Sequence, residues 1–172
     1  MNTAQEKRLV LGSQSEIRSH LLNKHLSLFN KEFVIHSSDL DESIIKSRID
    51  ISPNEKAIKL AEEKAYSVYL KLNKSDKDNY DYYVIGADQL CVMGNRIFDK
   101  PMTAEKAVEQ LSSLNGQTHF LISGIAICMN GKKVWAINDT VEMKMKQLTN
   151  KEIEDYVQLD QPLHSCGAYY YE

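Results

Sequence analysis

The apolar residues of this 172-residue chain fall into short continuous runs that alternate with stretches of helical spacing. The clearest run, 82–87, is Tyr-Tyr-Val-Ile-Gly-Ala, and Asp88 follows it directly. A short apolar run of this kind predicts a buried strand. The strand delivers the Asp88 carboxylate at its carboxyl end, where open α/β sheets place their ligand sites.

Strands and helices are predicted to alternate over the rest of the chain. The predicted strands are 9–11, 33–36, 82–87 with a continuation over 90–93 after Asp88, 96–98, 119–129, 133–138 and 141–145. The predicted helices are 15–29, 52–72, 103–114 and 149–157. No repeat or linker interrupts this order. We therefore predict a single domain of mixed α/β class over residues 1–172.

Hydroxyl groups gather at the first predicted strand-to-helix turn, where Ser13, Ser15 and Arg18 follow the strand. The N–H groups and the dipole at the start of a helix favour an anion. The guanidinium fork of Arg18 suits phosphate oxygens. The alternative is purely structural, because Ser13 and Glu16 have the spacing of a capping box and Arg18 is then a surface residue.

Carboxylates are concentrated after the second predicted strand, where Asp39, Asp41 and Glu42 fall within four positions. Mg²⁺ and Mn²⁺ take oxygen ligands of this kind, but a solvated acidic loop has the same composition. Asp88 is a stronger candidate, because burying a carboxylate is costly unless it has a partner or a task. It could bind a metal or act as a general base, with helix or turn capping as the alternative.

Two lysines are weak signals when each is taken alone. Lys64 lies in the middle of a predicted helix beside Glu62 and Glu63, and Lys100 precedes Pro101 and the next helix. An anion-binding turn, a strand-end Asp88 and an isolated Lys100 together indicate an enzyme that binds a phosphate chain and hydrolyses it.

Composition and charge then limit the classes of ligand and partner that we expect. A net charge of −3 gives no support for sequence-independent binding to a nucleic acid polymer, which needs a basic face, so small free nucleotides are the expected ligands. No apolar stretch reaches the length of a membrane span, and the polar N-terminus is unlike a signal peptide. The three cysteines match no zinc spacing, and we expect reduced thiols in a cytoplasmic protein.

Taken in order, these features resemble the Maf family of nucleoside triphosphate pyrophosphatases, over essentially the whole chain. The segments that carry the resemblance are Ser13-Gln14-Ser15-Glu16-Ile17-Arg18, Asp41-Glu42, Glu63-Lys64-Ala65, Gly86-Ala87-Asp88-Gln89, Lys100-Pro101, Leu114-Asn115-Gly116-Gln117-Thr118-His119, and Pro162-Leu163-His164 with Gly167-Ala168-Tyr169. Each motif is weak by itself, and their order and spacing make the resemblance specific.

The resemblance implies an inosine-triphosphatase-like fold, with a mixed twisted sheet flanked by helices and two lobes around a central cleft. It implies hydrolysis of a nucleoside triphosphate to the monophosphate and pyrophosphate with a divalent metal, Mg²⁺ or Mn²⁺. The roles it implies are catalytic for Asp88, Lys64 and Lys100, phosphate binding for Ser13, Ser15 and Arg18, and metal binding for Asp41, Glu42 and Asp88.

Three positions bear on the choice of base. Gln89 and Glu172 look like the 7-methyl-GTP subgroup of the family, whereas pyrimidine-type members usually have Thr and Gln there. A carboxylate at Glu172 can accept hydrogen bonds from the guanine N1–H and N2–H₂ groups. Ile17 fits neither subgroup, because Trp or Arg is usual at that position. The expected substrate is 7-methyl-GTP-like, with dTTP or UTP as the alternative.

The chain stops at Glu172, where family members continue through a further strand and a closing helix. We therefore expect a Maf-like domain that is short at its C-terminus. A weakly active nucleotide-binding remnant of the fold is the second alternative. The oligomeric state is left open, with a homodimer as one candidate.

Overall fold

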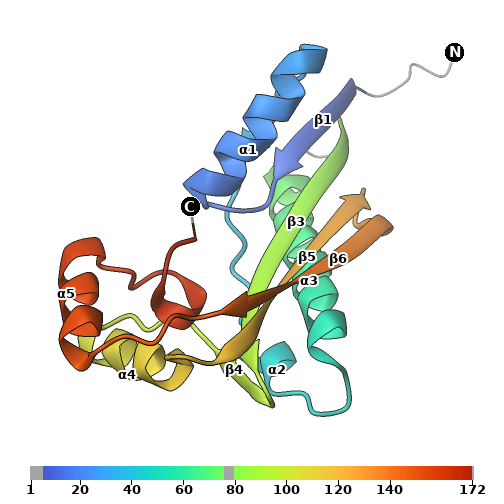
Figure 1. Ribbon diagram of the computed structural model, residues 1–172. Coiled ribbons are helices and arrows are strands. Elements are labelled where there is room, and N and C mark those ends of the chain that lie inside the picture. Colours follow the sequence, from blue (N-terminus) through green and yellow to red (C-terminus); the bar gives the residue numbers. More distant parts are fainter. Residues whose placement is uncertain (1–5, 76–79, 172) are drawn as a thin grey trace, which may run out of the picture. The chain divides into compact units, whose positions relative to one another are not determined.

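The computed structural model describes residues 6–75 and 80–171, and it confirms the mixed α/β class (Figure 1). The strands are β1 (Glu6–Leu11), β2 (Val34–Ile35), β3 (Tyr80–Met93), β4 (Arg96–Phe98), β5 (Thr118–Met129) and β6 (Lys132–Lys144). The α-helices are α1 (Glu16–Leu26), α2 (Ser43–Lys46), α3 (Pro53–Ser75), α4 (Ala104–Leu114) and α5 (Asn150–Asp160), and the 3₁₀ turns are η1 (Ser27–Phe29) and η2 (Cys166–Ala168). None of the described helices is both long and apolar enough to cross a membrane.

The strands form one sheet in the order β2–β1–β3–β5–β6, with β4 paired to β3. β1 runs parallel to β2 and to β3, and β4 runs antiparallel to β3. Leu11, the last residue of β1, lies opposite Ile85. The Gly12 N–H continues the pairing by donating to the Ile85 carbonyl at 2.8 Å. The turn between β1 and α1 therefore begins beside Ile85 of β3, three residues before Asp88.

Most predicted elements are confirmed, and the differences have simple causes. Residues 133–138 and 141–145 were predicted as two strands, but they belong to the single strand β6. β6 lies at the end of the sheet order and most of its side chains are exposed, so polar residues in its middle do not interrupt it. Helix α2 was not predicted, because its four residues are too few to show a helical period.

The chain forms two compact units. Unit 1 consists of the described residues of Met1–Asp88 and Gly124–Asn138, and unit 2 of those of Gln89–Ser123 and Asp139–Glu172. Strands β3, β5 and β6 each contribute residues to both units. The division on β3 falls between Asp88 and Gln89, so Asp88 belongs to unit 1 and Gln89 to unit 2. The central cleft that the resemblance implies stays a prediction.

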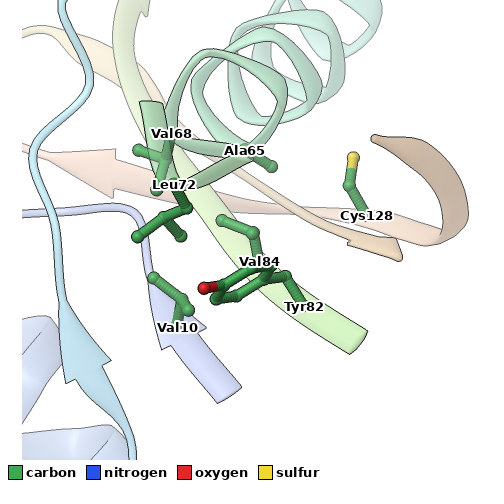
Figure 2. Close-up of a cluster of buried hydrophobic side chains, with 7 residues drawn as sticks. All are labelled: Val10, Ala65, Val68, Leu72, Tyr82, Val84 and Cys128. Carbon is green, nitrogen blue, oxygen red and sulfur yellow. The ribbon is translucent and has the colours of Figure 1, made fainter. Parts of the chain in front are cut away.

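The core of unit 1 lies between α3 and the sheet (Figure 2). Its buried members are Val10, Ala65, Val68, Leu72, Tyr82, Val84 and Cys128. Small residues let the helix approach the strand closely. A Cβ atom added at Gly86 on β3 would lie 1.9 Å from the Ala61 carbonyl oxygen of α3. The two backbones are thus in contact. This contact sets the distance between Lys64, one turn after Ala61 on α3, and Asp88, two residues after Gly86 on β3.

Unit 2 has its own core, in which α4 and α5 pack together with η2. Both helices begin at the predicted caps, Thr103 and Thr149, and Thr149 forms the predicted capping box with Glu152. The buried His119 ring contacts the Tyr169 hydroxyl, with Nε2 2.7 Å from the oxygen. Burial lowers the pKa of His119, although the Gln117 backbone opposes the shift. His119 is therefore a neutral core residue.

Candidate active site

Asp88 is buried near the middle of β3, with 7% of its surface exposed. One carboxylate oxygen, Oδ1, accepts a hydrogen bond from the Lys64 ammonium at 2.5 Å. The other oxygen, Oδ2, is buried and has no hydrogen-bond partner among the described residues. Asp88 is therefore anchored at one oxygen, and the second oxygen is left for a ligand, a water molecule or a metal.

Lys64 is held between two carboxylates. It comes from α3, and only 13% of its side chain is exposed. Its Nζ atom lies 2.5 Å from Asp88 Oδ1 and 2.7 Å from Glu42 Oε1. Its position in the middle of α3 beside Glu62 and Glu63 is also typical of a surface lysine. The structure instead places Lys64 largely out of solvent. The contact between α3 and β3 at Gly86 brings Lys64 to Asp88.

Glu42 stays ionised in this arrangement. Its Oε2 atom pairs with Lys46 at 2.7 Å, while Oε1 pairs with Lys64. Burial opposes ionisation of Glu42, but the hydrogen bonds from Lys46 and Lys64 outweigh it and lower the pKa to about 2. The pairing with Lys46 is helical, at a separation of four residues, so α2 holds this carboxylate in place.

Asp41 is placed differently from Glu42. It is exposed, and its Oδ1 atom accepts hydrogen bonds from the Ser43 backbone N–H at 3.0 Å and from the Ser43 hydroxyl at 2.7 Å. These bonds lower the pKa of Asp41. Asp41 thus stabilises the first turn of α2. Its role as a metal ligand stays a prediction.

The turn between β1 and α1, together with the start of α1, contacts the β3 backbone next to Asp88. Ser15, rather than Ser13, is the N-cap of α1, because its hydroxyl accepts from the Arg18 backbone N–H at 3.4 Å. The buried Ser13 hydroxyl accepts from Arg18 Nη1 at 3.2 Å. The same Nη1 atom donates to the Ala87 carbonyl at 2.9 Å. Arg18 is therefore directed at the residue before Asp88, and Ile17 beside it is 59% exposed.

The unit 2 candidates include one unpredicted network around Gln89. Gln89 Nε2 donates to the Ser123 hydroxyl at 3.0 Å, and the Cys166 thiol lies 3.8 Å from Gln89 Oε1. Ser123 and Cys166 are 34 and 77 residues from Gln89, so no local pattern predicts these contacts. The thiols of Cys91, Cys128 and Cys166 form no disulfide within the described chain.

The last two candidate residues are Lys100 and Glu172, and neither is a partner in the hydrogen bonds and ion pairs given above. Lys100 is exposed and lies before the buried Pro101, between β4 and α4. Glu172, on which the choice of base partly depends, lies outside the described residues.

The residues present fit a hard divalent cation. No three His, Cys, Asp or Glu side chains converge on one point within residues 6–75 and 80–171. However, Mg²⁺ bound with a nucleotide usually takes only one or two protein carboxylates, together with phosphate oxygens and water. Asp88 offers an unpartnered buried oxygen, and Glu42 is a second ionised carboxylate on the same lysine.

Comparison with known proteins gives a consistent picture. The model of the family described as Maf-like protein matches residues 8–172. A nucleoside triphosphate pyrophosphatase of Legionella pneumophila (strain Corby) is 38% identical over 170 residues, which cover 98% of this chain and 79% of that protein. A 7-methyl-GTP pyrophosphatase of Bdellovibrio bacteriovorus is 38% identical, with 95% and 79% of the two chains covered. A dTTP/UTP pyrophosphatase of Aquifex aeolicus is 34% identical, with 94% and 77% covered.

Proposed function

Because this chain belongs to the Maf-like protein family and is a nucleoside triphosphate pyrophosphatase, a hydrolase of acid anhydrides, we propose that its substrate is a 7-methyl-GTP-like nucleotide. The observation that carries the proposed site is the buried Asp88 carboxylate, paired to Lys64 through one oxygen and unpartnered at the other. Asp88 is the residue on which the chemistry depends.

Asp88 acts as the general base. The reaction adds water across the anhydride bond between the α- and β-phosphates, so one P–O bond forms and one breaks. The proton that the attacking water loses passes to the Asp88 carboxylate. In this structure Lys64 binds Oδ1, and Oδ2 has no hydrogen-bond partner among the described residues. The nucleoside monophosphate and pyrophosphate then leave, and the proton returns to solvent.

The cationic groups position the phosphate chain. Arg18 uses Nη1 to bind Ser13 and the Ala87 carbonyl, and its other guanidinium N–H groups can bind phosphate oxygens. The start of α1 adds backbone N–H groups that favour an anion. Lys100 is assigned to the phosphates through its motif. Positioning and charge neutralisation supply most of what cleavage of a phosphoanhydride requires.

Asp88 and Glu42 would hold a divalent cation, Mg²⁺ or Mn²⁺, with Asp41 as a further candidate ligand. Such a cation would supply positive charge to offset the charge that develops on the phosphate oxygens during cleavage. Glu42 is suited to this role because it remains ionised at every pH near neutrality.

The proposed preference for guanine rests on Gln89 and Glu172. Gln89 and Glu172 favour a methylated guanine, in keeping with the relative from Bdellovibrio bacteriovorus. Ile17 offers an exposed aliphatic surface rather than an aromatic ring, so it gives little discrimination between bases. Pyrimidine triphosphates are the second candidate, because the relative from Aquifex aeolicus is named a dTTP/UTP pyrophosphatase.

The test is release of pyrophosphate from 7-methyl-GTP, GTP, UTP and dTTP, each with Mg²⁺ or with Mn²⁺. We expect the highest kcat/KM with 7-methyl-GTP. A higher value with UTP or dTTP would instead support the pyrimidine alternative.

The role of Asp88 is tested with Asp88→Asn, which keeps the shape of the side chain and removes its basicity. Loss of a positioned general base lowers the rate by about 10²–10⁴-fold, and we expect a loss in that range with every nucleotide. Near wild-type turnover in a correctly folded Asp88→Asn variant would contradict the assignment of Asp88.

A further inference from the structure

The Lys64 ammonium lies between the two carboxylates that are the best metal ligands of this chain. It is 2.5 Å from Asp88 and 2.7 Å from Glu42, and the pair with Asp88 is shielded from solvent whereas Glu42 is partly exposed. Glu42 is held from its other side by Lys46. In this structure a single positive charge thus links two negative charges that would otherwise repel each other.

A divalent cation would use the same carboxylates as Lys64. An ammonium group and a hard cation are both attracted to carboxylate oxygens, and they repel one another strongly at distances of a few ångströms in a partly buried site. Asp88 Oδ2 is buried and accepts no hydrogen bond from the described residues, so its charge is uncompensated at that oxygen and favours a cation. Full coordination by Asp88 and Glu42 requires the ammonium to move away.

We propose that Lys64 competes with the divalent cation for Asp88 and Glu42, and that binding of the cation releases the Lys64 ammonium toward the phosphates. The inference rests on the proposed metal site. Lys64 then has two successive tasks. Without metal it neutralises the paired carboxylates, and with metal its freed charge is available to a phosphate oxygen. Metal binding and phosphate binding are thereby linked through one side chain.

The first experiment measures Mn²⁺ affinity without nucleotide, from the electron paramagnetic resonance signal of free Mn²⁺ during a titration at pH 8. In Lys64→Met the competing charge is gone, and we expect the affinity to rise by about tenfold or more over the wild type. Lys59→Met is the matched control. Lys59 is on the same helix and pairs with Glu63 at 2.7 Å, so the variant has the same change in charge away from Asp88. We expect its affinity to stay within about twofold of the wild type.

Turnover moves in the opposite direction from affinity. Lys64→Met lacks the ammonium that binds phosphate, so we expect pyrophosphate release to fall while Mn²⁺ binds more tightly.

The second experiment makes its measurement on the wild-type protein. Lysine labelled with ¹³C at Cε reports the surroundings of each ammonium group by nuclear magnetic resonance, and folded Lys64→Arg and Lys59→Met assign the two signals. We expect saturating Mg²⁺ to shift the Lys64 signal and to leave the Lys59 signal in place.

The outcomes separate this inference from the proposed metal site. Equal Mn²⁺ affinity in the wild type and Lys64→Met, with binding lost in Asp88→Asn, would overturn the competition and leave the metal site standing. No Mn²⁺ binding in any of the three proteins would overturn both. Tighter binding in Lys64→Met, together with the Mg²⁺-dependent shift, would support the competition.

Discussion

Glu42 illustrates how one residue can link the site to the stability of the fold. Two lysines contact its carboxylate, one from the next turn of α2 and one from α3. These contacts overcome the effect of burial and lower the pKa of Glu42 to about 2, whereas a glutamate in an unfolded chain titrates near 4.5. The unfolded chain therefore binds a proton between these values that the folded chain does not bind.

The sign of the pH dependence follows from this difference. The stabilisation by Glu42 is fully present above about pH 4.5 and is lost as the pH falls toward 2. We expect Glu42→Gln to be less stable than the wild type at pH 6 by at most about 2 kcal/mol, because Glu42 is partly exposed and solvent screens its ion pairs. The difference should shrink steadily below pH 4.5. Urea unfolding midpoints between pH 6 and pH 2.5 measure it.

Asp50→Asn is the control for this prediction. Asp50 pairs with Arg48 on the surface, and the Arg48 hydrogen bond lowers the pKa of Asp50 to about 2. Because both side chains are well exposed, we expect a smaller pH-dependent difference for Asp50→Asn. A constant difference between Glu42→Gln and the wild type across the whole range would contradict the role assigned to Glu42.

Individual residues were predictable from the sequence where a motif or an apolar run marks them. Asp88 stands out because it ends an apolar run, and the structure buries it. Its expected place at the carboxyl end of the strand was wrong, because β3 continues through Asp88 to Met93. Glu42 was a candidate through the cluster of carboxylates at 39–42, whereas the role of Lys64 was predicted only through the resemblance. Ser123 was missed, because its contact with Gln89 joins residues that are far apart in sequence. Such pairs depend on the register and packing of β3 and β5, which no local pattern encodes.

At the scale of elements, the close approach of α3 to the sheet positions the site. Gly86 lies against the Ala61 carbonyl, and Gly124 on β5 lies equally close to α3, with an added Cβ 2.2 Å from the Ala57 carbonyl oxygen. The sequence predicted α3 and both strands, because their periodicity and caps are strong. The contacts between them could not be predicted, since an isolated glycine in a strand signals a close approach without naming the partner.

Gly86→Ala tests this contact. The added methyl group would overlap the Ala61 carbonyl, so α3 or β3 must shift and Lys64 must move relative to Asp88. We expect a loss of about 1–3 kcal/mol in the free energy of unfolding, together with slower hydrolysis. Urea unfolding and pyrophosphate release measure the two effects.

Gly12→Ala is the matched control for Gly86→Ala. At Gly12 the nearest atom to an added Cβ is the Ile85 carbonyl oxygen at 3.2 Å, so the neighbour needs to move only slightly. We expect a smaller loss of stability than in Gly86→Ala. Equal losses in the two variants would contradict the importance of the α3–β3 contact.

At the scale of the whole molecule, most candidate residues of each task lie in one unit. Unit 1 contains Asp88, Lys64, Glu42 and Arg18, which act on phosphate, water and metal in the proposed mechanism. Unit 2 contains Gln89 with its partners Ser123 and Cys166, and Gln89 is assigned to the base in the proposal. The division is not complete, because Lys100 lies in unit 2 and Ile17 lies in unit 1.

This division predicts two different kinetic signatures. Arg18→Ala removes charge-assisted hydrogen bonds that every triphosphate can use, and we expect kcat/KM to fall by about 10- to 100-fold with 7-methyl-GTP and UTP alike. Ser123→Ala removes the hydroxyl that holds the Gln89 amide. A neutral hydrogen bond contributes about 0.5–1.5 kcal/mol, so we expect the ratio of kcat/KM between 7-methyl-GTP and UTP to change by about 2- to 10-fold.

The decisive comparison is between two quantities in each variant: the ratio of kcat/KM for 7-methyl-GTP to that for UTP, and kcat/KM itself for each nucleotide. Gln89→Ala should change the ratio at least as much as Ser123→Ala, because Ser123 acts through the Gln89 side chain. If Gln89→Ala changes the ratio and Ser123→Ala does not, the Gln89 amide does not need Ser123 to face the base. If Arg18→Ala changes the ratio as much as Gln89→Ala, selection is not confined to unit 2. A change in ratio for the two unit 2 variants alone would show that base selection and phosphate chemistry can be altered independently in this fold.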